Sequence, residues 1–175
     1  MPIDFDQIDD FVDSAANAIA KYHIQFTLSP NQISKFPSPE NDLHWESIPY
    51  GDEHIENVPS DRRGIYAFAI CSEVASLPPH CYVLYIGIAG RKSQRSLRER
   101  YRDYLNMKKV AKRARIARMI SSWRAVLRFY YAPVSPETTS DQLEEIEKQL
   151  NGALLPPMAE GDVEATIKAQ RRAFR

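Results

Sequence analysis

The chain has 175 residues, of which 43% are hydrophobic and 26% charged, a composition typical of one compact domain and not of a disordered chain. No run of about 18 apolar residues occurs, which excludes a membrane-spanning helix, and two cysteines exclude a disulfide-rich scaffold or a four-cysteine zinc site. The first residues lack the basic start and apolar stretch of a secretory signal, so we expect a cytoplasmic protein.

The formal net charge is zero, but the charges are segregated along the chain. Residues 1–61 carry 12 acidic and 2 basic side chains, whereas residues 62–133 carry 16 basic and 3 acidic ones. This asymmetry predicts a basic surface for a polyanion, beside an acidic segment with another task.

Residues 1–61 are predicted to form an acidic N-terminal extension. Apolar residues recur at three- and four-residue spacing from Phe5 to Tyr22, which predicts a helix from about Asp4 to Tyr22. We expect its apolar face to pack on the core; covering the basic surface and binding a partner are the alternatives. Prolines punctuate the rest of the extension, which is interpreted as loop with one short strand at 43–48.

Residues 62–159 are predicted to form the main domain. Apolar, β-rich stretches predict an antiparallel arrangement of three strands, at 64–71, 81–88 and 125–132. Capping residues and apolar periodicity predict three helices, at 96–106, 108–123 and from about 140 to the residue before Pro156. The predicted fold is therefore α+β, a small three-stranded antiparallel sheet flanked by helices, with an N-terminal helical extension and a C-terminal tail, 160–175, that is helical at about 163–172.

Two tripeptides in the predicted hairpin carry the functional signal. Gly64-Ile65-Tyr66 lies on its first strand and Tyr85-Ile86-Gly87 on its second, and together they resemble the strings for which the GIY-YIG nuclease family is named. The family pattern continues with Arg100 in the following helix, and with Glu147 in a later helix, followed by leucine at +3 and proline at +9. The resemblance covers about residues 62 to 158.

The resemblance implies a Mg²⁺-dependent endonuclease that hydrolyses DNA phosphodiester bonds, with Tyr66, Tyr85, Arg100 and Glu147 as catalytic residues. Glu147 would hold Mg²⁺ or another divalent cation through its carboxylate oxygens. Arg100 would pair with phosphate oxygens in a fork geometry. A tyrosine would orient the attacking water, or deprotonate it if a nearby cation lowered its pKa. Whether the substrate is DNA or RNA is not distinguished by the sequence.

The chain departs from the family pattern in three ways. It has 18 residues between Tyr66 and Tyr85, more than the family usually has, so the hairpin loop is enlarged. The asparagine that usually follows the proline is Ala159 here, and the nearest candidate for the cation after the second tripeptide is Arg91. The alternative function is therefore a catalytically inactive module of the same fold that binds nucleic acid or a protein partner.

The predicted helix at 108–123 is strongly basic. From Lys108 to Arg124 the chain has seven cations and no acid, which is typical of a surface that follows phosphates, so we predict nucleic-acid contacts here. The predicted contact residues are Lys108, Lys109, Lys112, Arg113, Arg115 and Arg118.

Strand parity gives a prediction for the hairpin. Opposed residues in a regular antiparallel pair have a constant sum, and Tyr66 and Tyr85 share a face only where that sum is odd. The same register places Cys71 and Cys81 on opposite faces, which argues against a disulfide between them unless a bulge intervenes. We therefore expect two small buried apolar cysteines.

Overall fold

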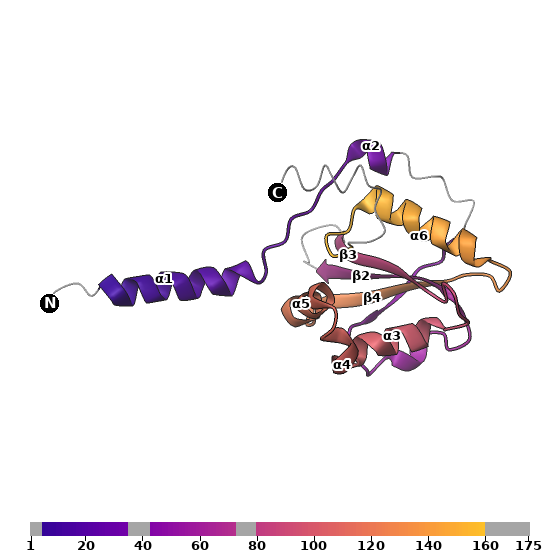
Figure 1. Ribbon diagram of the computed structural model, residues 1–175, viewed down its shortest axis with the longest axis horizontal. Helices are drawn as coiled ribbons and strands as arrows, with labels where there is room; N and C mark the ends of the chain where they lie inside the picture. The colour runs from indigo at the N-terminus through magenta and orange to yellow at the C-terminus, as the bar shows by residue number, and fades with distance from the viewer. Residues whose placement is uncertain (1–4, 35–42, 73–79, 160–175) are drawn as a thin grey trace.

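The computed structural model describes residues 5–34, 43–72 and 80–159 (Figure 1). An antiparallel sheet of four strands, in the order β1-β4-β2-β3, forms its centre. The strands are β1 (Glu46–Pro49), β2 (Gly64–Ser72), β3 (His80–Ala89) and β4 (Leu127–Pro133). The α+β prediction is confirmed, but the prediction of three strands is wrong by one, because the short strand expected in the extension pairs with β4 and buries Ile48.

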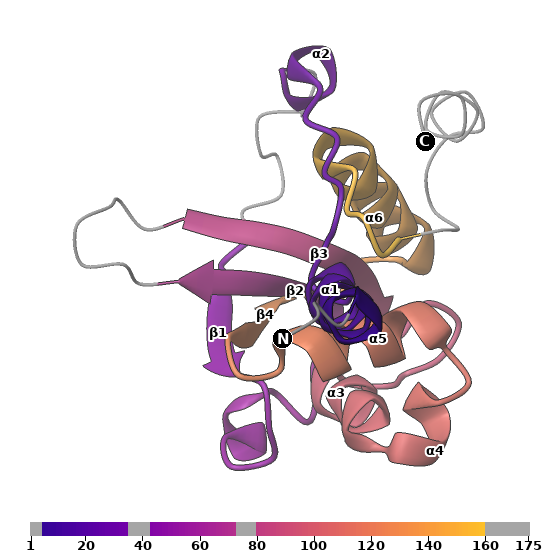
Figure 2. The same cartoon turned by 90° about the vertical axis from the view of Figure 1, so that its left-hand side faces the viewer.

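Helices cover both faces of the sheet (Figures 1 and 2). The helices of the main domain are α3 (Leu97–Leu105), α4 (Met107–Val110), α5 (Ala114–Trp123) and α6 (Ser140–Leu154). Successive residues of a strand point to opposite faces, so β2 feeds two cores. Tyr66 and Phe68 pack with residues of α3 and α5, whereas Ile65 and Ala67 pack with residues of α6.

The helix boundaries follow from local chemistry. Ser96 caps α3, as predicted, and the structure adds a capping box between Ser96 and Glu99. The helix predicted at 108–123 is instead two helices, α4 and α5, with Arg113 as the non-helical residue before α5. The last helix begins at Ser140, as predicted, and Thr139 caps it in a capping box with Gln142. The tail helix at 163–172 and Asp4 lie outside the described residues.

The N-terminal extension contains α1 (Phe5–Ala20) and the short α2 (Pro30–Ile33). The helix prediction is confirmed, but the expected packing of its apolar face is wrong: Phe11 is 73% exposed and Ile19 68%. Figure 1 shows α1 extending away from the sheet, which leaves its apolar stripe in solvent. The segment after the helix does pack, since Ile24 and Phe26 lie against the main core.

The β2–β3 hairpin contains a β-bulge, which determines whether Cys71 and Cys81 can pair. Phe68 pairs with Tyr85 but Ala69 pairs with Val83, so Leu84 is an extra residue and the pairing sum changes from odd to even. Tyr66 and Tyr85 share a face as predicted, because they lie on the odd side of this bulge.

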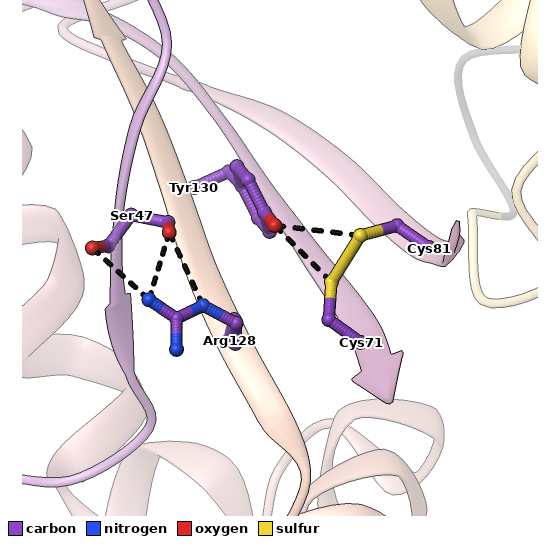
Figure 3. The surroundings of a disulfide bond; sticks show 5 residues. All are labelled: Ser47, Cys71, Cys81, Arg128 and Tyr130. Carbon is purple, nitrogen blue, oxygen red and sulfur yellow. Dashed lines mark hydrogen bonds between the residues drawn. A yellow bond between two sulfur atoms is a disulfide. The ribbon is translucent and has the colours of Figure 1, made fainter. Parts of the chain in front are cut away.

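Beyond the bulge Cys71 stands directly opposite Cys81, with 4.6 Å between their Cα atoms, and the two form a disulfide. The prediction of unpaired cysteines is therefore wrong, and the bulge is the reason. Figure 3 shows the hydroxyl of Tyr130 within hydrogen-bonding distance of both sulfur atoms, at 3.1 and 3.4 Å.

No helix in the described ranges is long and apolar enough to cross a bilayer. Disulfides persist mainly in oxidising compartments, so the Cys71–Cys81 disulfide gives no support to the predicted cytoplasmic location. That location stays a prediction.

The disulfide gives the first testable prediction. It closes a loop with a sequence separation of 10, so replacing both cysteines with alanine should lower the free energy of unfolding by about 2 to 3 kcal/mol. Urea unfolding of the wild type and the C71A/C81A protein, each with and without a thiol reductant, measures the difference. The prediction is contradicted if the urea midpoint of the wild type stays the same at a reductant concentration that reduces the disulfide.

Candidate active site

A cavity of about 320 Å³ opens beside the end of β3. Tyr66 from β2, Tyr85 from β3, Arg100 from α3 and Glu147 from α6 all line it, so four residues from four elements meet at one place. The loop that follows β3 closes the cavity with Arg91 and Arg95 among its lining residues. The structure thus brings together every residue for which the motif resemblance predicts catalysis.

The glycines of the two tripeptides are explained by close approach. A Cβ on Gly87 would lie 2.5 Å from the hydroxyl oxygen of Tyr66, which stands opposite it in the hairpin. A Cβ on Gly64 would collide with the carbonyl oxygen of Ala132 on β4. Only glycine fits these positions: Gly87 leaves room for the hydroxyl of Tyr66, and Gly64 lets β2 lie close to β4.

The side chain of Tyr66 is fully buried, and its hydroxyl makes two hydrogen bonds. Arg100 Nε donates a hydrogen bond of 2.9 Å to it, and it shares a second of 2.7 Å with the hydroxyl of Tyr104. Tyr104, one turn after Arg100 on α3, was not among the sequence-predicted site residues. Its spacing from Arg100 was the available signal, since residues four apart share a helix face.

Burial holds the tyrosines in their neutral form. It raises the pKa of Tyr66 well above its usual value, with Tyr104 and Tyr85 adding to the effect, and Arg100 lowers it by less. Burial also raises the pKa of Tyr85 to about 12. Both phenols are therefore protonated at neutral pH, which suits them to orient a water or phosphate oxygen and does not suit them to remove a proton.

Arg113 belongs to this site and not to an exposed helix face. It donates a hydrogen bond of 3.3 Å to the hydroxyl of Tyr85, and its guanidinium lies 5.0 Å from the ring centre of Tyr104. The break between α4 and α5 turns the residue inward. Helical periodicity across 108–123 therefore misassigned it to the exposed basic face.

The other predicted nucleic-acid contacts spread over α4 and α5. Lys108, Lys109 and Lys112 are exposed, and Arg115 is partly buried. Arg118 is exposed but donates to the carbonyl oxygens of Ala20 and His23, at 3.3 and 2.9 Å. The end of α1 and the residues just after it thus meet the basic surface at Arg118.

Glu147 is the acid of the cavity, and its residue is only 4% exposed. Arg91 pairs with its carboxylate and also lies 3.5 Å from Glu144, one turn earlier on α6. The loop cation considered as a family counterpart therefore contacts the predicted metal ligand directly.

Asn151 lies one turn beyond Glu147 and is completely buried. Neither its amide nitrogen nor its amide oxygen has a hydrogen-bond partner among the described residues. Residues four apart on a helix bring their Cβ atoms to about 5–6 Å, so a hydrated cation on Glu147 could be reached by this amide. One carboxylate, one orphaned amide and waters suit Mg²⁺, which keeps most of its hydration shell. No cluster of three or more His, Cys, Asp or Glu side chains forms in the described ranges, so an all-protein cage is not part of this site.

Comparison with known proteins gave no match: no family model, no curated protein and no solved structure is significantly similar to the chain.

Asn151 gives the second prediction. An unpaired buried amide costs stability, so replacing Asn151 with leucine should raise the free energy of unfolding of the metal-free protein by about 1 kcal/mol. The same change should reduce the increase in melting temperature that Mg²⁺ produces, because the amide no longer reaches the ion's water shell. Thermal melts in EDTA and in a Mg²⁺ titration measure both effects. A less stable metal-free variant would show that the amide is satisfied in the folded protein.

Proposed function

We propose that the protein is a Mg²⁺-dependent endonuclease that hydrolyses DNA phosphodiester bonds, as its resemblance to the GIY-YIG nuclease family implies. The observation that carries the proposal is the convergence of Tyr66, Tyr85, Arg100 and Glu147 on one cavity. These residues are widely separated in the sequence, and a set of unrelated surface residues would not be expected to meet.

The chain's own groups match the needs of phosphodiester hydrolysis. The Arg100 guanidinium, held by Tyr66, offers fork-like donors to the oxygens of the scissile phosphate. The protonated hydroxyl of Tyr85 positions the attacking water or a phosphate oxygen, and the buried hydroxyl of Tyr66 holds Arg100 in place. Arg113 and Arg91 add positive charge where negative charge accumulates on the phosphate.

Glu147 and Asn151 would hold the divalent cation, which when bound acts as a Lewis acid and lowers the pKa of a coordinated water. Arg91 pairs with Glu147, so with substrate bound Arg91 would turn to the phosphate and Glu147 would serve as the cation ligand. This exchange keeps the carboxylate neutralised before and after substrate binding.

The second candidate is a module of the same fold that binds nucleic acid or a protein partner without cutting. Ala159 favours it, because this residue stands where the family usually has an asparagine and is buried without an amide. A nicking assay separates the two candidates.

The third prediction tests the carboxylate. Glu147→Ala should abolish Mg²⁺-dependent nicking of a supercoiled plasmid while DNA binding in EDTA is retained, because the carboxylate serves the metal and not the phosphate contact. Glu145→Ala is the matched control, since Glu145 is an exposed acid on the same helix. Nicking by Glu147→Ala at the wild-type rate would remove Glu147 from the site. An RNA of the same sequence, assayed in parallel, determines which nucleic acid is cut.

The fourth prediction tests the basic surface. Lys108 and Lys112 are exposed, so replacing both with alanine should leave the fold intact. Two lost phosphate contacts should flatten the slope of log K against log salt by about 1.8 for duplex DNA. Fluorescence anisotropy with a labelled duplex between 50 and 300 mM salt measures the slope, with Lys148→Ala on α6 as the control. An unchanged slope would place the nucleic acid elsewhere.

A further inference from the structure

Asp103 on α3 is a buried acid that contacts three cations. Its residue is 8% exposed. Arg95 reaches both of its carboxylate oxygens, at 3.0 and 2.8 Å, and Lys109 Nζ lies 2.6 Å from Oδ1. Arg100 Nη1 lies 3.4 Å from Oδ2. The three cations come from the loop before α3, from α3 itself and from α4, so the carboxylate joins three segments of chain.

Two of the three cations do not need this acid as a partner. Burying a carboxylate costs free energy that its ion pairs only partly repay. The side chains of Arg95 and Lys109 are 41% and 56% exposed, so both could be solvated without it. Burial alone would raise the pKa of Asp103, but hydrogen bonds from Arg95 and Lys109 outweigh it and lower the pKa to about 2. The group is therefore a permanent negative charge at working pH.

The contacts of Arg100 show what the acid achieves. One edge of the planar guanidinium bonds to Tyr66 through Nε, and Nη1 faces Asp103. Two fixed partners set the plane of the group. Arg95 and Arg100 both line the cavity, and Asp103 lies between them. Three cations around one carboxylate leave two net positive charges in this cluster, and two of the three cations, Arg95 and Arg100, line the cavity.

We propose that Asp103 is a positioning residue that gathers Arg95, Arg100 and Lys109 into one binding cluster for the phosphates of a polynucleotide. The inference rests on the proposed function and extends it: Arg100 takes the scissile phosphate, and Arg95 and Lys109 take the neighbouring phosphate of the same strand. Asp103 itself contacts no substrate and acts through the cations.

Because of this role, replacing Asp103 should change the binding affinity and the nicking rate in opposite directions. Asp103→Asn removes a negative charge beside three cations, so binding of a polyanion should be tighter, by up to about tenfold, and its salt slope steeper by about 0.9. The asparagine nitrogen would be a donor facing the donors of Arg95 and Arg100, which displaces the guanidinium from its position on Tyr66. A misplacement of about 1 Å costs about 100-fold in rate, so nicking should slow by that order.

The experiment measures both quantities on the full chain. A labelled 20-base-pair duplex in EDTA gives the affinity and its salt slope, and plasmid nicking with Mg²⁺ gives the rate. Glu145→Gln makes the same charge change at an exposed site and should move neither. Circular dichroism and a thermal melt confirm the folded fraction of each variant. Asp103→Glu keeps the charge in a longer side chain and should retain the wild-type salt slope while nicking more slowly.

Tighter, more salt-sensitive binding by Asp103→Asn together with slower nicking supports the proposal. Weaker binding by the folded variant, or nicking at the wild-type rate, overturns it. If Asp103→Asn does not fold, Asp103→Glu decides: slow nicking with an unchanged salt slope supports the proposal, and wild-type nicking overturns it. If the wild type nicks no nucleic acid, the nuclease function fails, and the binding measurements alone decide the role of Asp103.

Discussion

The hydroxyl of Tyr66 lies inside the aromatic core, and Arg100 and Tyr104 supply the hydrogen bonds that such a burial requires. Its ring contacts those of Phe68 and Phe129 in the same layer, with centroids 6.3 and 5.5 Å apart. Packing of the core therefore requires Arg100 at this position, as the proposed chemistry does. Because an unsatisfied phenol in this layer would cost about 1 to 3 kcal/mol, the sheet and α3 are held in a fixed relation at the point where the cavity opens.

The sequence predicted the site best where a steric requirement of the backbone lies close to a functional side chain. Gly64 and Gly87 are fixed by close approach, and each is two residues from a site tyrosine, so the two tripeptides carried both the hairpin and part of the site. The cap at Ser96 set the start of α3 and hence the position of Arg100. These features depend on neighbours in the chain or directly across the hairpin, which is why a single sequence could disclose them.

Features that depend on distant partners were missed or misplaced. Leu84 looks like any strand residue, yet as the extra residue of the bulge it decides that Cys71 and Cys81 meet. Arg113 reads as one cation in a basic run, but a two-helix break directs it to Tyr85. The apolar stripe of α1 predicted packing on the core, and no sequence rule distinguishes a stripe that is covered in this domain from one that is exposed, as Phe11 is.

The buried polar residues of the described chain fall into two kinds. The cost of burying the Ser96 hydroxyl is offset by its hydrogen bond as the cap of α3, which is an ordinary structural use. Asp103, Glu147 and Asn151 are not required by any helix end or turn, and each lies in the cavity lining, beside a residue of it, or one turn from it. A core built for stability alone would place apolar side chains at these positions, because paired or unpaired burial of such groups rarely yields a net gain. Their concentration around one cavity indicates that this region of the fold gives up stability for a preorganised arrangement of charge, as the proposed stabilisation of a phosphoryl transition state would require.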